Sequence, residues 1–127
     1  MGRYYWGDIE GKFWFAVQSS DDASNFGVEG KYHDKTQTID YEFQKEDLLK
    51  VDEQLLAIKY KLGSYMSELN EFFEKNNGYN DEMLVEQTNI PAEEVSKAMQ
   101  LYARYGLGVE IRDCILKNGS CMFEAEC

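Results

Sequence analysis

A long amphipathic segment over residues 46–76 constrains the fold of this chain more than any other feature. Its apolar side chains recur at alternating spacings of three and four residues, at Leu48, Val51, Leu55, Ile58, Leu62, Tyr65, Leu69 and Phe72. A heptad pattern sustained over more than three heptads predicts one helix over residues 46–76. Such a helix would be roughly 45 Å long, with Gly63 marking a kink or a close crossing point near its middle.

The apolar stripe of this helix needs a surface to pack against. Four further residues widen the stripe beyond the seam of a two-stranded coiled coil: Leu49, Leu56, Met66 and Phe73. We favour an antiparallel partner within the same chain, formed by the later helices. The alternative is a homodimer through helix 46–76.

Three further segments have the features of β-structure. Residues 3–18 contain two aromatic-rich runs separated by Glu10-Gly11, which predicts a hairpin. Residues 36–43 and 121–126 alternate apolar and polar side chains, as half-exposed strands do. One helical turn, capped by Ser20 or Asp21, is expected to end at Gly27. We therefore predict a single α+β domain over residues 1–127, in which a small antiparallel sheet packs on the long helix and on a second helical segment.

That second helical segment resembles a helix-turn-helix over residues 84–108. Asn76-Asn77-Gly78 ends the long helix, and a short helix over residues 81–87 is followed by a longer one from Pro91 to about Tyr105. Gly106 and Gly108 are expected to break the chain before a last helix over residues 109–117. A DNA-reading helix needs basic or amide side chains near its first turn. Here that position holds Ala92, Glu93 and Glu94, which would repel phosphate.

Acidic side chains gather in the same region. Residues 68–94 contain eight of them against one basic residue, Lys75, which gives a local charge of −7: Glu68, Glu71, Glu74, Asp81, Glu82, Glu86, Glu93 and Glu94. Rows of carboxylates resemble a phosphate backbone in charge and suit a basic nucleic-acid channel on another protein. The alternative is an acidic surface that only keeps a small protein in solution.

Aromatic residues of the N-terminal hairpin are a second candidate contact. Six of them are too many for one face of a hairpin: Tyr4, Tyr5, Trp6, Phe13, Trp14 and Phe15. Because aromatic side chains are enriched at interface cores, we select Tyr5, Trp6 and Trp14 as partner-binding candidates. A sheet covered on both faces would explain them equally well.

The chain offers little for catalysis or metal binding. His33 is the only histidine, and the sequence nominates no partner for it. The spacings of Cys114, Cys121 and Cys127 match no common zinc site. We expect no enzymatic activity, no metal and no cofactor, with the three thiols reduced in the cytoplasm.

Charge and hydropathy limit the partners. The 127 residues carry a net charge of −11, which argues against direct nucleic-acid binding through phosphate neutralisation. The sequence contains no long apolar run and no signal-peptide pattern, so neither a membrane span nor secretion is expected.

Three stretches, GRYYWGDIEGKFWFAVQSSDDA, FFEKNNGYNDEMLVEQ and NGSCMFEAE, are similar to parts of small acidic proteins of phage and environmental viral genomes. The resemblance implies a phage accessory protein in the cytoplasm of a bacterial host cell. By analogy with anti-CRISPR proteins, it implies a non-enzymatic, DNA-mimicking inhibitor of a nucleic-acid-handling defence protein, such as a CRISPR effector. A helix-turn-helix transcriptional regulator and a small structural or assembly protein are the alternatives.

Overall fold

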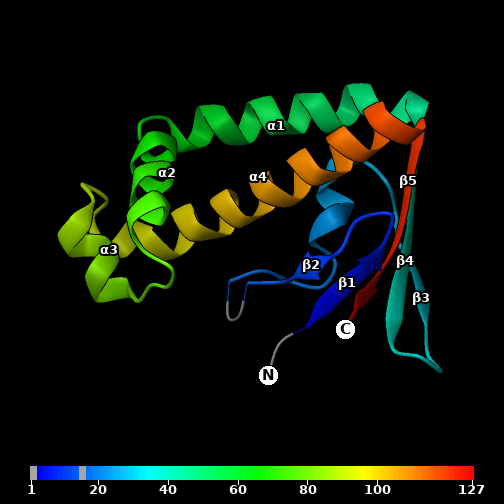
Figure 1. Cartoon of the computed structure of the whole chain (residues 1–127), viewed down its shortest axis with the longest axis horizontal. Coiled ribbons are helices and arrows are strands. Elements are labelled where there is room, and N and C mark those ends of the chain that lie inside the picture. The colour runs from blue at the N-terminus through cyan, green and yellow to red at the C-terminus, as the bar shows by residue number, and fades with distance from the viewer. Residues whose placement is uncertain (1–2, 15–16) are drawn as a thin grey trace.

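The computed structural model describes residues 3–14 and 17–127, and it confirms the α+β class. Its strands are β1 (Tyr4–Gly7), β2 (Gly11–Lys12), β3 (Lys31–His33), β4 (Thr38–Gln44) and β5 (Ser120–Glu126). Its helices are α1 (Leu48–Leu62), α2 (Tyr65–Lys75), α3 (Asp81–Gln87) and α4 (Ala92–Asn118), with short 3-10 turns η1 (Asp22–Phe26) and η2 (Lys45–Asp47). The sheet stands at one end of α1 and α4, and α2 and α3 lie at the other (Figure 1).

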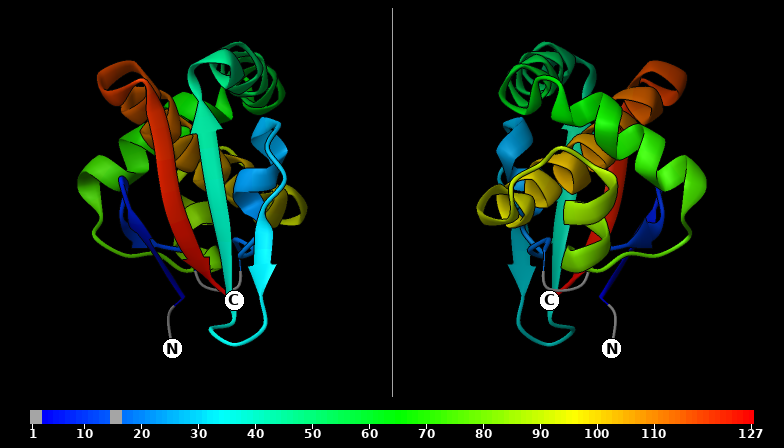
Figure 2. Two further views of the ribbon diagram at one scale, coloured as in Figure 1. Left: turned by 90° about the vertical axis from the view of Figure 1, so that its right-hand side faces the viewer. Right: turned by 90° about the vertical axis from the view of Figure 1, so that its left-hand side faces the viewer.

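The sheet is antiparallel in the order β2-β1-β5-β4-β3. The last strand, β5, therefore lies between β1 and β4, with Phe123 opposite Tyr41 and Ala125 opposite Tyr5. Phe123 and Ala125 are buried and Met122 is exposed, which agrees with the half-exposed strand predicted over residues 121–126. The inner face packs on α4, while no helix of the described chain covers the outer face (Figure 2).

The N-terminal hairpin is shorter than predicted, because β2 contains only Gly11 and Lys12. Phe13 then leaves the sheet for the core, and Trp14 packs against Phe73 of α2 and Tyr102 of α4 at ring-centroid distances of 5.3 and 6.1 Å. The predicted strand residues Phe15 and Ala16 lie outside the described residues. A strand that we did not predict, β3, pairs with β4 and forms one edge of the sheet.

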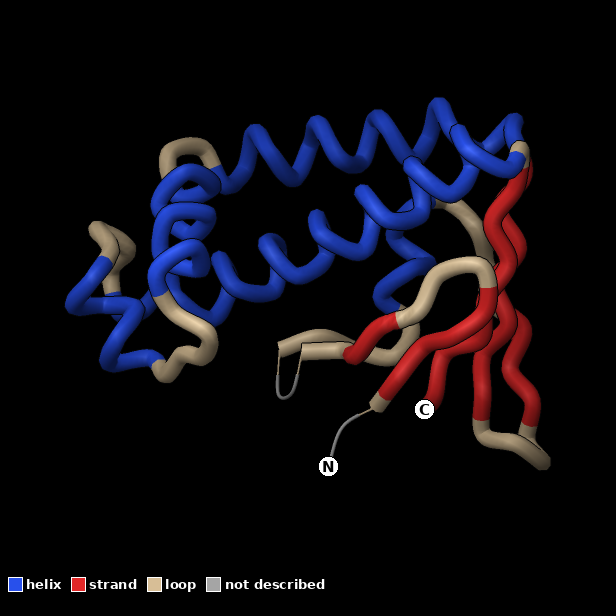
Figure 3. The backbone as a smooth tube through the Cα atoms, in the orientation of Figure 1, coloured by secondary structure: helices blue, strands red, loops and turns tan. Residues whose placement is uncertain are grey.

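The prediction of one helix over residues 46–76 is wrong. Gly63 has φ 54° and ψ −128°, which an α-helix does not contain, and the chain turns there from α1 into α2 (Figure 3). The heptad stripe is nevertheless buried along both helices, at Val51, Leu55, Ile58, Leu62, Leu69 and Phe72. Because α1 packs along α4, the predicted partner within the chain is confirmed and the stripe cannot also form a seam between two copies.

The prediction of two helices separated at Gly106 and Gly108 is also wrong, since α4 continues from Ala92 to Asn118. The two glycines lie inside this helix for different reasons. A Cβ on Gly108 would lie 2.4 Å from the Phe26 ring and 2.7 Å from a Leu55 methyl group, so α4, η1 and α1 meet there with no room for a side chain. A Cβ on Gly106 would have nothing within 4 Å.

The turn η1 is fixed to α4 by a buried ion pair. Asp22 accepts hydrogen bonds from Nε of Arg104 at 2.8 Å and from the Gln18 amide at 2.9 Å. As predicted, η1 ends at Gly27, which is left-handed with φ 98°. This connection closes the core between the sheet and the two long helices.

Candidate functional site

The eight predicted carboxylates lie together on α2, α3 and the first turn of α4, which we call the acidic end. This end is farthest from the sheet (Figure 1). Its three elements share a buried apolar centre formed by Leu69, Phe72, Leu84, Ile90 and Val95. The side chain of Asn80 caps α3 by accepting a hydrogen bond from the Met83 amide at 2.8 Å, so this short helix has a defined start.

Three of the carboxylates have partners within the chain. Glu68 is half-buried and accepts a hydrogen bond from the Asn89 amide at 3.0 Å, which ties α2 to the loop before α4. Glu94 accepts from the Tyr65 hydroxyl at 2.9 Å, and Glu71 forms an exposed ion pair with Lys75 at 3.3 Å. These three side chains help to position the acidic end as well as to charge it.

The other five carboxylates face solvent. Within the described chain, their side chains make neither an ion pair nor a hydrogen bond, and all five are exposed: Glu74, Asp81, Glu82, Glu86 and Glu93. Exposed carboxylates without cations beside them remain available for a basic partner.

The local field at the acidic end is negative. The hydrogen bond to Glu94, desolvation and the charges of Glu94, Glu68 and Glu93, in that order, raise the pKa of the Tyr65 hydroxyl. The same negative field would attract a positively charged side chain of a partner protein.

The three aromatic candidates, Tyr5, Trp6 and Trp14, lie in different environments. Tyr5 is 7% exposed and its hydroxyl donates to Glu110, so the structure places it in the core and its selection as a surface contact is not supported. Trp14 is likewise committed to the ring cluster with Phe73 and Tyr102. Trp6, at 38% exposure on the outer face of the sheet, is the most exposed of the three, whereas Trp14 is half-buried.

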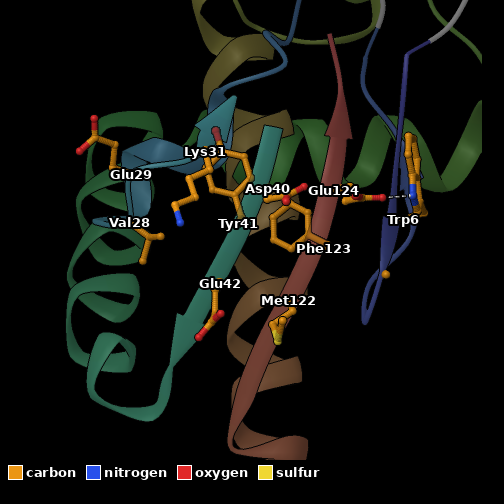
Figure 4. A pocket seen from close by; sticks show the side chains of 11 residues that line it. Trp6, Val28, Glu29, Lys31, Asp40, Tyr41, Glu42, Met122, Phe123 and Glu124 are labelled. Carbon is orange, nitrogen blue, oxygen red and sulfur yellow. Dashed lines mark hydrogen bonds between the residues drawn. The ribbon is translucent and has the colours of Figure 1, made fainter. Parts of the chain in front are cut away.

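The outer face of the sheet is hollowed between Trp6 on one side and Val28 and Glu29 on the other (Figure 4). The hollow has a volume of about 590 Å³, and Asp40 and Glu124 lie directly opposite each other across β4 and β5 within it. The Trp6 indole donates to Glu124 at 2.7 Å. This face adds a second, smaller group of carboxylates that residues 68–94 do not include.

Sequence reasoning missed the partner of His33. Its Nε2 lies 2.7 Å from Oδ2 of Asp40, in a pair that is about half exposed. The sequence signal for this pair was the turn between His33 and Asp40. It is informative only when β3 is recognised as a strand, because the pairing of β3 with β4 then brings the two residues close together. Within the described chain, this pair makes no hydrogen bond to a hydroxyl, thiol or amine that it could activate, and no three His, Cys, Asp or Glu side chains there could hold a metal.

The helix-turn-helix-like pair is formed by α3 and α4, and Ile90 and Val95 are buried between them. The second helix of this pair was expected to end at about Tyr105, whereas α4 continues to Asn118. Glu93 and Glu94 occupy its exposed first turn. The arrangement therefore presents carboxylates at the position where a DNA-reading protein presents side chains that bind phosphate.

Comparison with protein-family models, curated proteins and solved structures found no match to this chain. None of the helices in the described ranges combines the length and hydrophobicity that a membrane span requires.

Proposed function

We propose that this protein is a non-enzymatic inhibitor whose acidic end occupies a basic nucleic-acid-binding surface of another protein. The observation that supports this function best is the set of five exposed carboxylates without partners, held on three packed elements next to three further carboxylates. The single cation within residues 68–94, Lys75, reduces the charge of the eight carboxylates only from −8 to −7.

The proposed binding is electrostatic in origin. Charges held on a fixed scaffold steer a basic partner and pair with its Arg and Lys side chains, and salt screens both effects. Trp6 and the carboxylates of the outer sheet face are a secondary contact in this proposal.

The resemblance to phage proteins supports a place of action and a kind of partner. We propose the cytoplasm of a bacterial host as the place, and a nucleic-acid-handling defence protein, such as a CRISPR effector, as the partner.

The test is a pull-down from bacterial lysate with a matched pair of charge variants. One variant carries Glu74→Lys, Glu82→Lys and Glu86→Lys at the acidic end. The control carries Glu10→Lys, Glu46→Lys and Asp113→Lys, which are exposed away from both the acidic end and the hollow of the outer sheet face. Each reversal adds two charge units, so both variants change the net charge from −11 to −5.

We expect the wild type and the control to retain a nucleic-acid-binding protein that high salt releases, and the acidic-end variant to lose it. The captured protein should bind its own nucleic acid less well when this protein is present. Equal capture by both variants, or no capture by the wild type, would contradict the proposal.

A helix-turn-helix regulator is the second candidate, because α3 and α4 form the expected helix pair. A gel shift at low salt against genomic fragments separates the two functions, since only the regulator binds DNA directly. A small structural or assembly protein, the third candidate, would instead recover only copies of itself in the pull-down.

A further inference from the structure

Helix α1 exposes an apolar ridge on the side opposite its buried stripe. Leu49 is 71% exposed, Leu56 is 68% exposed and Tyr60 is 89% exposed. Their spacings of seven and four residues place them on one face of the helix, with Glu53 between them. Three large apolar side chains on one face of a 15-residue helix form a surface that lacks a partner within the described chain.

The charge around this ridge differs from that of the rest of the chain. Residues 45–62 have no net charge in a protein of −11, because four basic residues balance four acidic ones: Lys45, Lys50, Lys59 and Lys61 against Glu46, Asp47, Asp52 and Glu53. Two copies of so acidic a protein repel each other through most other surfaces. The outer face of α1 is a place where they can approach without that repulsion.

The balance is also uneven along the helix. Residues 45–54 carry −2, of which the charge of Asp52 is paired with Arg112 of α4, and residues 55–62 carry +2. Two parallel α1 helices would bring like halves together, whereas two antiparallel helices bring each acidic half against a basic half. Charge complementarity therefore selects a second copy in the antiparallel orientation as the occupant of this face.

We propose that the ridge of Leu49, Leu56 and Tyr60 forms the interface of a two-fold symmetric homodimer, with α1 antiparallel to α1 of the second copy. With the axis near Leu56, residues three positions to either side face each other, so Glu53 of one copy lies opposite Lys59 of the other. The symmetry makes this contact twice. This face is distinct from the buried heptad stripe, and the dimer does not depend on the function proposed for the acidic end.

The size of the ridge sets the expected affinity. A helix of 15 residues is about 22 Å long, so two such helices bury an area at or below the lower limit of about 1,200 Å² for specific interfaces. We therefore expect a dimer with a dissociation constant in the micromolar range.

Sedimentation velocity at concentrations that span the micromolar range tests the proposal. Wild-type protein should change from monomer to dimer, and Leu56→Asp should remain monomeric. Glu53→Lys and Lys59→Glu each replace two attractive pairs by two repulsive ones and should each weaken the dimer about tenfold. The double variant exchanges the charges and should restore the affinity of the wild type.

Three results would overturn the proposal: a wild type that stays monomeric throughout, a dimer that survives Leu56→Asp, or a double variant no tighter than either single one. All three positions are exposed, so circular dichroism spectra and urea midpoints should match the wild type and serve as the control for folding.

Discussion

Gly106 and Gly108 lie two residues apart in α4, and the same substitution should have opposite effects on the free energy of unfolding at the two positions. At Gly106 a Cβ would meet nothing within 4 Å. Alanine is favoured over glycine inside a helix by about 1 kcal/mol. Gly106→Ala should therefore stabilise the protein by about that amount.

At Gly108 the added methyl group has no space. Its position would be 2.4 Å from the Phe26 ring and 2.7 Å from a Leu55 methyl group, and both side chains are buried. Forcing a methyl group into a filled core costs up to about 3 kcal/mol, and the helix preference of alanine offsets about 1 kcal/mol of it. Gly108→Ala should therefore destabilise the protein by about 2 kcal/mol.

Urea denaturation followed by far-UV circular dichroism measures both changes. The two substitutions remove the same conformational freedom from the unfolded chain, so the difference between the variants, about 3 kcal/mol, isolates the contacts of the folded state. Thermal midpoints should differ by about 10 °C. Two shifts of the same sign, or a stabilising Gly108→Ala, would refute the assignment of Gly108 to the crossing of α4, η1 and α1.

Two further predictions concern buried polar groups. Asp22→Ala leaves Arg104 without its buried partner and should lower the free energy of unfolding, measured in urea, by about 3 kcal/mol. Asp52→Ala breaks a half-exposed pair and should lower it by less than about 1 kcal/mol. Equal losses in the two variants would contradict the argument from burial. Burial and the hydrogen bond to Glu110 raise the pKa of the Tyr5 hydroxyl above its ordinary value of 10.0, so above about pH 10 the unfolded state loses this proton first and stability falls as pH rises. In urea titrations across this range, Tyr5→Phe should reduce that loss by up to about 1.4 kcal/mol per pH unit, and an unchanged slope would argue against the contribution of Tyr5.

The sequence predicted best those elements whose ends are set by neighbouring residues. The range of α3 follows from Asp81 after a capping Asn80, and β5 follows from alternation between Cys121 and Glu126. The acidic end was also foreseeable, because its carboxylates are close along the chain. Their individual bonds, such as Glu68 to the Asn89 amide, depend on how α2 packs against the loop before α4.

Glycine shows where sequence reasoning stops. Gly63 and Gly108 both lie within apolar helical patterns, yet the chain turns at the first and continues as a helix through the second. The difference comes from the surroundings: Gly63 adopts a positive φ, whereas Gly108 lets Phe26, which is distant in sequence, contact the helix closely. A single sequence does not show which distant residue will pack against a given glycine.

The position of β5 in the sheet sets an order for folding during synthesis. Because β5 separates β1 from β4, the N-terminal hairpin has no strand beside it until residues 120–126 leave the ribosome. The helices, whose hydrogen bonds are local, can form earlier. During translation β1 therefore keeps an unpaired edge, and the nascent chain is exposed to wrong strand pairing or chaperone binding until β5 emerges.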